Sequence, residues 1–451
     1  MTSKETADIL NNNSPNTKNK KKKAWTLGFL TLTLFMIFVF FYTFYICDLT
    51  LYQTLIFAIS FYTMATMGIC LIFKNKQSKK INTNYRPFIS IIVPAKNEEK
   101  VIEKTIRSLF EIDYSIDGNV NYEVLVVDDN STDSTYSIIE KLKAEYPTLL
   151  PLKRIEGAKG KSAVLNYAIP YSKGELIAVF DADSKIEPDF FNKTVVHFYD
   201  ETIVGAQGRV RIINRNQNFI TKFQDDEFSI FAHMLQLSKA IYGGVMQLAG
   251  NGQLTRRSAL LSVGGWNETS ATDDQDLTAQ FLLQGQFIQY VPDAIVWQEA
   301  ITKIYPFLRQ RIRWAEGMLK CIFDYFYDVT LSKKLSLLQK IDGLSGLMRI
   351  VATLVVWIGY IQLLTVIFFK LNYTCFMPIA MCNIYLVTSL ALIVMASGLW
   401  KYSDKPNIFI AIKVIFYWFC NIFWLIAAPI GLYNCIKNRN KIEWDKTEHT
   451  G

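Results

Sequence analysis

The sequence predicts an α/β domain built on a mixed, mostly parallel sheet and flanked by transmembrane helices. Between residues 88 and 183, short apolar strands alternate with helices, the pattern of a sheet that helices cover on both faces. Outside that region, five long stretches contain no Asp, Glu, Lys, Arg or His, and each can cross the hydrocarbon core of a bilayer as a helix. These stretches are 24–47, 49–73, 350–369, 371–400 and 414–436.

Composition and charge narrow the function classes. Of the 451 residues, 51% are hydrophobic and 20% are charged, which excludes intrinsic disorder as the main state. The net charge of +8 is concentrated in two basic stretches, 1–24 and 74–86. Nucleic-acid-binding proteins spread basic residues over a folded face, so this distribution disfavours a nucleic acid as partner. The Asn- and Lys-rich segment 1–23 is expected to be disordered.

Residues 24–73 are predicted to form two transmembrane helices. Lys20–Lys23 precede the first stretch, but a small-residue cleavage pattern is missing and a second apolar stretch follows at once. The first stretch is therefore an anchor rather than a signal peptide. Basic flanks favour the cytoplasmic side, which predicts a multi-pass protein of the plasma membrane with residues 74–340 in the cytoplasm.

Beyond residue 340 the predicted topology is less regular. Segment 326–349 is expected to be an interfacial helix region, and 350–436 to hold about three transmembrane helices. Three full crossings would place the tail 437–451 outside, whereas its basic residues favour the cytoplasm. We therefore expect one of the three stretches to be re-entrant or interfacial.

The region between the apolar stretches predicts four strands and three crossover helices. Ligands of such sheets bind beyond the carboxyl ends of the strands. The strands are expected at 88–95, 123–127, 150–155 and 176–180, and the helices at 97–110, about 134–146 and 161–169, the first of them capped by Asn97.

Acidic residues follow two of these strands. Asp128 and Asp129 come at the end of the second strand, and Asp181 and Asp183 directly after the fourth. Two carboxylates two residues apart suit Mg²⁺ or Mn²⁺, because such ions bind one or two carboxylates together with substrate phosphates. For an isolated pair of this kind, an exposed polar turn is the competing interpretation.

A third acidic cluster, Thr272–Asp276, opens a predicted helix that ends near Gln284. The helix macrodipole favours one or two carboxylates at such a position, but this cluster contains three. Mutual repulsion raises the pKa of clustered carboxyl groups, which suits a general base.

The segment Arg309–Trp314 combines three arginines with an indole ring. One interpretation is a basic amphipathic helix that lies on the membrane surface. The other is a binding site in which a guanidinium holds a diphosphate and the indole stacks on a sugar ring.

Together these motifs resemble the membrane-bound family-2 glycosyltransferases, over residues 88 to about 320. The resemblance implies a GT-A fold for residues 85–325, a UDP-sugar donor, a divalent metal and inversion at the anomeric carbon. It rests on Ile91–Glu98, Val127–Asp133, Gly160–Ala163, Asp181–Asp183, Thr272–Leu277 and the Q-x-x-R-W motif Gln310–Trp314.

Carried over by position, the resemblance assigns roles at the donor end. Asp129 would contact the uracil, with Lys161 nearby. Asp181 would contact the nucleotide-sugar, and Asp183 would bind Mg²⁺ or Mn²⁺ on the diphosphate.

At the acceptor end, the resemblance makes Asp274 the base that deprotonates the acceptor hydroxyl. Its neighbour Asp273 stands where the family normally has Glu. Gln310, Arg313 and Trp314 would line the acceptor or diphosphate site.

Two enzymatic functions fit this resemblance. The Q-x-x-R-W motif is typical of members that extend cellulose-, chitin-, hyaluronan- or poly-N-acetylglucosamine-like chains. It predicts a processive polysaccharide synthase that exports its product across the membrane. Accessory export proteins would be partners of such an enzyme. The alternative is a glycolipid synthase, because Gly250–Gln253, Asp273–Thr278 and Arg313–Gly317 also resemble the cyanobacterial enzymes that glucosylate diacylglycerol. A third class, a channel or transporter with a nucleotide-sensing domain, is disfavoured because the apolar stretches hold no charged residue.

The last residues carry one further expectation. Trp444–Gly451 resembles the short segment that closes over the UDP-loaded site in related synthases. The tail 437–451 is therefore predicted to be a cytoplasmic gate.

Overall fold

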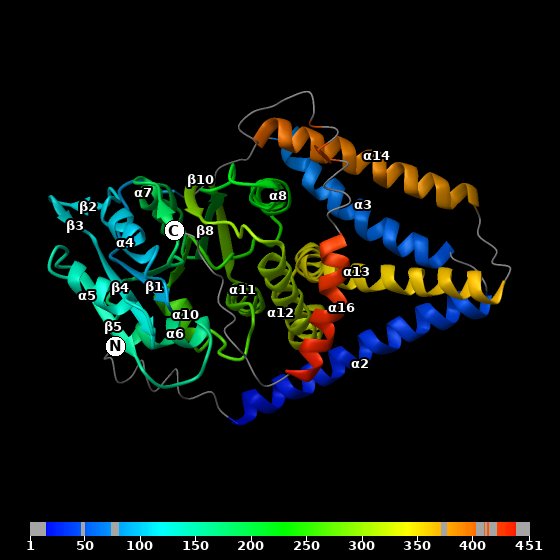
Figure 1. Ribbon diagram of the computed structural model, residues 1–451, viewed down its shortest axis with the longest axis horizontal. Coiled ribbons are helices and arrows are strands. Elements are labelled where there is room, and N and C mark those ends of the chain that lie inside the picture. Colours follow the sequence, from blue (N-terminus) through cyan, green and yellow to red (C-terminus); the bar gives the residue numbers. More distant parts are fainter. Residues whose placement is uncertain are drawn as a thin grey trace.

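The structure is a computed structural model that describes residues 15–46, 50–73, 81–370, 377–402, 410, 413–414 and 422–438. An α/β domain forms one side of the molecule, and long helices extend from the other (Figure 1). These helices are α2 (Pro15–Ile46), α3 (Thr50–Ile72), α13 (Leu337–Phe369) and α14 (Met377–Tyr402). The predicted gate at 437–451 lies outside the described residues except for Lys437 and Asn438.

In the described part of the chain, eight strands form the central sheet. Its strand order is β5 (Leu149–Arg154), β4 (Tyr122–Asp129), β1 (Ile89–Ala95), β6 (Leu176–Val179), β9 (Gln253–Arg256), β8 (Ile203–Ile212), β10 (Phe287–Gln298) and β7 (Lys185–Ile186). Strands β5, β4, β1 and β6 are parallel, as are β8 and β10. Only β9 and β7 run against their neighbours. The predicted mixed, mostly parallel sheet is confirmed.

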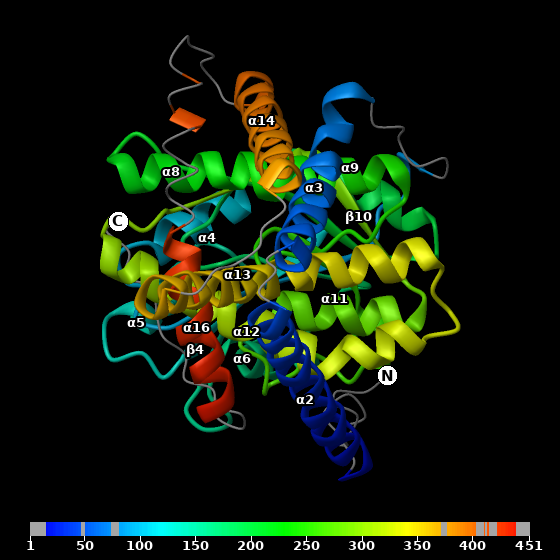
Figure 2. The same cartoon turned by 90° about the vertical axis from the view of Figure 1, so that its right-hand side faces the viewer.

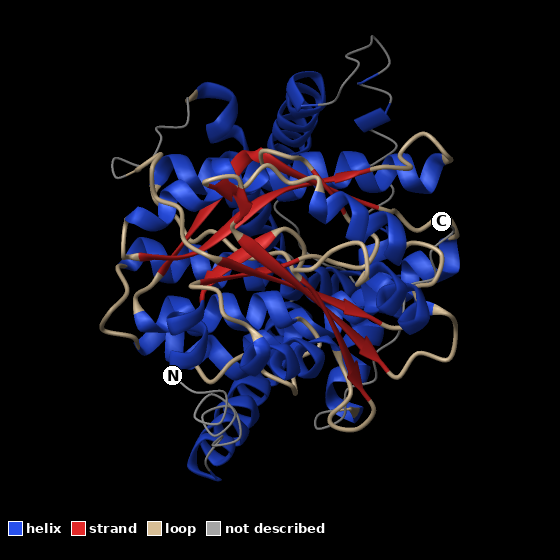
Figure 3. Ribbon diagram, turned by 90° about the vertical axis from the view of Figure 1, so that its left-hand side faces the viewer, coloured by secondary structure: helices blue, strands red, loops and turns tan. Residues whose placement is uncertain are grey.

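Helices lie on both sides of the twisted sheet (Figure 3). Strands β1, β4 and β6 are buried along their whole length, because both faces bear apolar side chains that pack under helices. The helices and short 3-10 helices of the α/β domain are α4 (Ile102–Phe110), α5 (Thr135–Leu142), α6 (Lys161–Ala168), η1 (Ile169–Tyr171), α7 (Phe190–Thr194), η2 (Val195–Tyr199), α10 (Arg257–Ser262) and α11 (Asp273–Gln284). A small separate hairpin consists of β2 (Ser115–Ile116) and β3 (Asn119–Val120).

The predicted strands and crossover helices agree with the structure apart from one cap. Asn97 does not begin the first helix, since α4 starts at Ile102. Asn97 has a left-handed backbone with φ of 54°, and its side-chain oxygen accepts a hydrogen bond from the Thr132 amide (2.7 Å). It therefore joins the two loops that follow β1 and β4, a contact that no local sequence pattern announces.

One long helical segment crosses above the sheet. It consists of α8 (Phe219–Glu227), the π-helical stretch η3 (Phe228–Met234) and α9 (Leu235–Tyr242). A capping box between Asn218 and Thr221 begins it, and Gly243, with φ of 76°, ends it. Such π-helical interruptions are frequent at functional sites.

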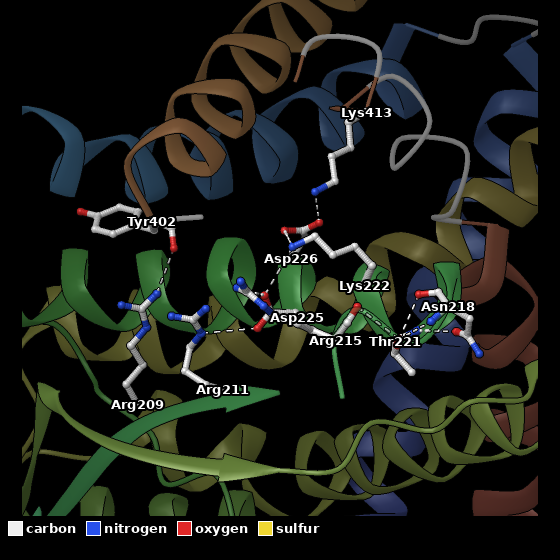
Figure 4. A network of polar contacts seen from close by, with 10 residues as sticks. All are labelled: Arg209, Arg211, Arg215, Asn218, Thr221, Lys222, Asp225, Asp226, Tyr402 and Lys413. Carbon is white, nitrogen blue, oxygen red and sulfur yellow. Dashed lines mark hydrogen bonds and ion pairs between the residues drawn. The ribbon is translucent and has the colours of Figure 1, made fainter. Parts of the chain in front are cut away.

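Charged side chains tie α8 to the sheet and to the helical part (Figure 4). The carboxylates of Asp225 and Asp226 are buried. Asp225 pairs with Arg211 of β8 at 3.4 Å, while Asp226 pairs with Lys222 at 3.5 Å and with Lys413. Because a buried carboxylate without a partner is strongly destabilising, the pairs with Arg211 and Lys413, which lie outside α8, fix the helix in place.

Three helices in the described residues are long and apolar enough to cross a membrane: Lys23–Tyr42 in α2, Thr54–Ile72 in α3 and Ile350–Phe369 in α13. Figure 2 views the molecule from the side that carries them. Helix α2 begins at Pro15, within the segment that was expected to be disordered. The expected interfacial region 326–349 contains the end of α12 (Ile304–Leu331) and the start of α13.

The last apolar stretch forms a short helix, α16 (Ile422–Lys437), of 16 residues. At 1.5 Å per residue it is about 24 Å long, less than the roughly 30 Å of the hydrocarbon core. It lies against α12, where a Cβ on Gly431 would come within 2.8 Å of the Ala315 Cβ. A glycine is required at this close approach.

A proline inside α16 accounts for its contact with α13. Pro429 has no N–H to donate to the carbonyl of Leu425, four residues earlier. That carbonyl instead accepts a hydrogen bond from the Trp357 indole of α13 (2.8 Å). The contact fixes α16 beside α13 at the base of the long helices.

Candidate active site

A large cavity of about 1240 Å³ lies between the carboxyl ends of the central strands and the helical part. Of the predicted site residues, all except Asp129 line it: Lys161, Asp181, Asp183, Asp274, Gln310, Arg313 and Trp314. The cavity thus brings together motifs that lie far apart in the chain, from Lys161 to Trp314. Its position agrees with ligand sites of α/β sheets in general.

The loop after β6 carries Asp181 and Asp183. The Lys161 ammonium, at the start of α6, bonds Asp181 Oδ1 at 2.6 Å and the Gly250 carbonyl at 2.8 Å. Burial by itself lowers the pKa of Lys161, but the carboxylates of Asp181 and Asp273 raise it on balance. Lys161 is therefore a permanent cation at the carboxylate end of the cavity.

Asn251 holds this acidic loop in place. Its side-chain oxygen accepts bonds from the Asp181 amide (3.3 Å) and the Ser184 hydroxyl (3.0 Å). Its side-chain amide donates to Gln298 at the end of β10 (3.0 Å). The sequence marked Gly250–Gln253 through its resemblance to the enzymes that glucosylate diacylglycerol, and the positioning role of Asn251 was missed.

Asp183 accepts a hydrogen bond from the Glu299 amide (3.0 Å). The described residues contain no group of three or more His, Cys, Asp or Glu side chains that could bind a metal by themselves. Mg²⁺ and Mn²⁺ do not need such a cage, because phosphates and water supply their remaining ligands. The two carboxylates therefore fit a metal that binds together with a diphosphate.

Asp129 lies at the end of β4, outside the residues that line the cavity. Its carboxylate pairs with the Arg154 guanidinium of β5 at 2.6 Å and with Lys96 at 3.1 Å. Lys161, which the resemblance placed near Asp129, pairs with Asp181 instead. Asp129 and Lys161 thus belong to two separate ion-pair groups along the strand ends.

The acidic cluster at the start of α11 divides into two kinds of residue. Asp273 and Asp274 line the cavity. Asp276 is buried and accepts hydrogen bonds from Tyr325 of α12 (2.9 Å) and from Asn267 (2.8 Å). Asp276 therefore anchors the helix, and the first two carboxyl groups remain for chemistry.

Burial raises the pKa of Asp274 to about 7, and repulsion from Asp273 adds to this shift. Burial also raises the pKa of Asp273, although Lys161 opposes the shift. One Asp273 oxygen is buried and has no hydrogen-bond partner among the described residues. A carboxyl group with a pKa near neutrality can take up a proton during a reaction.

Helix α12 forms the opposite wall with Gln310, Arg313 and Trp314. It approaches α11 closely at Gly317, where any Cβ would overlap the Thr272 side chain. Burial lowers the pKa of Arg311, which lies behind this wall and not in it. Helix α12 therefore sets the distance between the acidic cluster of α11 and its own Q-x-x-R-W motif.

The sequence did not identify Glu227 and Trp424, which also line the cavity. Glu227 forms an ion pair with Arg311, and the Trp424 indole donates to it (3.3 Å). These residues come from α8, α12 and α16, and an isolated Glu or Trp in a helix carries no pattern that could have marked it.

The end of the cavity that η3, α13, α14 and α16 form is largely apolar. Ile230, Ile350, Met395 and Ile430 line it, together with the polar residues Thr353, Asn434, Lys437 and Asn438. The cavity thus joins a charged end, at the sheet, to a largely apolar end between helices, one of which, α13, is long and apolar enough to cross a membrane.

Comparison with known proteins agrees with this geometry. The family described as "Glycosyltransferase like family 2" matches residues 86–317. The chain is 42% identical over 250 residues to the beta-monoglucosyldiacylglycerol synthase of Nostoc sp., covering 55% of this chain and 52% of the relative. It is 25% identical over 350 residues to the poly-beta-1,6-N-acetyl-D-glucosamine synthase of Staphylococcus epidermidis, covering 76% and 81%. The chain spans about half the length of the glucosyldiacylglycerol synthases that it matches.

Among solved structures, a mannosyltransferase from Pyrobaculum calidifontis in complex with GDP-Man and Mn²⁺ has a similar fold. The TM-score is 0.52 at 19% identity, over 87% of this chain and 99% of that one. The similarity confirms the predicted GT-A fold.

Proposed function

This chain belongs to glycosyltransferase family 2, and we propose that it transfers a hexose from a UDP-sugar to a lipid acceptor of the diacylglycerol type. One observation carries the choice of acceptor: a single cavity joins the carboxylate end to a largely apolar end formed in part by α13, which is long and apolar enough to cross a membrane. A lipid can place its hydroxyl at the first and its acyl chains at the second. The 42% identity to glucosyldiacylglycerol synthases supports the same acceptor.

In the proposed reaction Asp274 is the general base. Its carboxylate takes the proton of the acceptor hydroxyl while that oxygen attacks the anomeric carbon. The bond from this carbon to the diphosphate breaks, UDP leaves, and the configuration inverts. A pKa of about 7 suits this role, because half of the groups are ionised near neutral pH.

Lys161, Asp181 and Asp183 would bind the donor. Asp183, with Asp181, would hold Mg²⁺ or Mn²⁺, which neutralises charge on the departing diphosphate. Asp129, paired with Arg154 and Lys96, would contact the uracil from the neighbouring strand end. Gln310, Arg313 and Trp314 would line the acceptor side.

A processive polysaccharide synthase is the second candidate function. The Q-x-x-R-W motif and the match to a poly-N-acetylglucosamine synthase, over 76% of this chain, favour it. The sequence motifs alone favour a polysaccharide acceptor. The largely apolar end of the cavity favours a lipid acceptor, because a growing glycan would meet mostly hydrocarbon side chains there.

The proposed site of action is the plasma membrane, with the α/β domain in the cytoplasm. The three membrane-length helices and the basic flanks at 1–24 and 74–86 support this location. We expected one of the last three apolar stretches to be re-entrant or interfacial, and the short helix α16 is suited to that place. A tail that follows an interfacial α16 would lie in the cytoplasm.

The test uses purified full-length protein with labelled UDP-glucose, UDP-N-acetylglucosamine or GDP-mannose and vesicles that contain diacylglycerol. We expect label from a UDP-sugar to enter the organic phase only when diacylglycerol is present, and Asp274→Asn to abolish it. Label that stays in a water-soluble polymer, independent of diacylglycerol, would favour the polysaccharide synthase.

A further inference from the structure

The buried cation Arg311 lies behind Trp314, one of the residues of α12 that line the cavity on the proposed acceptor side. The Arg311 side chain has no exposed surface, and its guanidinium lies 4.2 Å from the ring centres of both Trp314 and Phe307. Its neighbour Gln310 accepts one hydrogen bond from it (2.6 Å). A guanidinium between two rings fixes their faces, because its planar charge attracts both π-systems.

The position of Arg311 depends on one carboxylate. Glu227 of α8 forms its ion pair, and the Nε of Arg311 has no hydrogen-bond partner among the described residues. Glu227 in turn accepts a hydrogen bond from the indole of Trp424 on α16 (3.3 Å). Three helices therefore meet at this carboxylate, and the acceptor wall is connected through it to the short apolar helix.

We propose that Glu227, Arg311 and Trp424 form a positioning unit that holds the Trp314 ring against the acceptor. The proposal rests on the proposed function. Arg311 does not line the cavity, whereas Glu227 and Trp424 do. Arg311 therefore acts through Trp314 and does not touch the substrate, so the Arg311 variant isolates the positioning effect. Binding of the acceptor then depends on the positioning unit. Binding of the donor, at Lys161, Asp181 and Asp183, does not depend on it.

A purely structural role is the competing explanation, in which the ion pair only joins α8, α12 and α16. That role predicts a lower melting temperature with no preference between substrates. The positioning role predicts a selective change in the KM for the acceptor.

The first variant is Trp424→Phe, which keeps the ring and removes only the N–H that bonds Glu227. We expect the acceptor KM to rise about tenfold or more, the usual effect of losing one hydrogen bond to a charged group. The KM for the UDP-sugar and the rate of UDP-sugar hydrolysis without acceptor should not change. A second variant, Arg311→Lys, keeps the charge and loses the planar stacking, and should raise the acceptor KM by about tenfold.

The matched control is Trp297→Phe. The Trp297 indole also donates to a glutamate, Glu187 (2.6 Å), but neither residue lines the cavity. This control removes the same kind of hydrogen bond and should leave both KM values unchanged.

Equal changes in both KM values, or a loss of melting temperature with unchanged acceptor KM, would overturn the positioning unit. A wild-type protein that glycosylates no lipid would instead refute the proposed function. The same comparison then uses an N-acetylglucosamine oligosaccharide as acceptor, and a selective rise in its KM would support the unit while the lipid is abandoned.

Discussion

The two ends of the cavity are built in different ways. The proposed donor end consists of loops at strand ends, where Asp181 and Asp183 follow β6 and Asn251 precedes β9. The acceptor end consists of helix faces from α8, α12, α13 and α16, which come together from distant parts of the chain. A change at the donor end should therefore affect chemistry or nucleotide binding, and a change at the acceptor end should affect the acceptor alone.

The largest expected effect is on the transfer rate, when the proposed general base Asp274 is replaced. Asp274→Asn keeps the size of the side chain but cannot accept the proton of the acceptor hydroxyl. Loss of a general base commonly costs about 10²- to 10⁴-fold in rate. We expect this loss in a transfer assay, with UDP affinity measured by calorimetry nearly unchanged. An equal loss of UDP affinity would assign Asp274 to the donor end.

The next largest effect is expected where Gly317 of α12 approaches the Thr272 side chain at the start of α11. Gly317→Ala introduces a methyl group that overlaps Thr272, which displaces α11 and its two carboxyl groups. A displacement of about 1 Å can cost 10²-fold in rate. The control is Gly68→Ala on α3, where the new Cβ meets only Val394 at 3.6 Å and activity should persist. A fully active Gly317→Ala protein would show that α11 and α12 move freely.

The pH dependence of transfer sharpens the role of Asp274. Its raised pKa of about 7 means that the active carboxylate form is lost as the pH falls through neutrality. The rate should rise about tenfold between pH 6 and 8, and then level off. In Asp273→Asn, which removes a repelling charge, the rise should shift to lower pH. An unchanged midpoint in that variant would contradict the coupling of the two groups.

The smallest expected effect belongs to the apolar end. Ile350→Val removes one methylene from the wall that α13 contributes. Loss of one buried methylene is about 0.8 kcal/mol, so the KM of a long-chain diacylglycerol should rise about two- to fourfold. The KM of the UDP-sugar serves as the internal control, and a change in it would place Ile350 in general packing.

The sequence predicts the donor half of the molecule well, for a local reason. Apolar strands such as Ile89–Ala95 are buried on both faces, and the charged residues that follow them must lie at the sheet edge. Fold class, strand positions and the acidic loops could all be read from neighbouring residues. The antiparallel strand β9 and the left-handed Asn97 could not, since they depend on partners far along the chain.

For the proposed acceptor half, the sequence marks only some of the residues that the structure brings together. The Q-x-x-R-W motif marked Gln310, Arg313 and Trp314, but not Arg311, whose role follows from Glu227 more than 80 residues earlier. Nor could the sequence distinguish Asp276, which anchors α11 to Tyr325, from the cavity residues Asp273 and Asp274. Helix contacts of this kind depend on tertiary packing and leave no periodic pattern.

The most direct test asks where the acceptor lies. A diacylglycerol with a photoreactive group near the end of one acyl chain is irradiated with the full-length protein in vesicles, and the labelled peptides are identified by mass spectrometry. We predict labelling of α13, α14 or α16, at the segments around Ile350, Met395 and Ile430 that line the cavity, and its suppression by unlabelled diacylglycerol. Labelling confined to the outer faces of α2 and α3, with no competition, would contradict a lipid acceptor in this cavity.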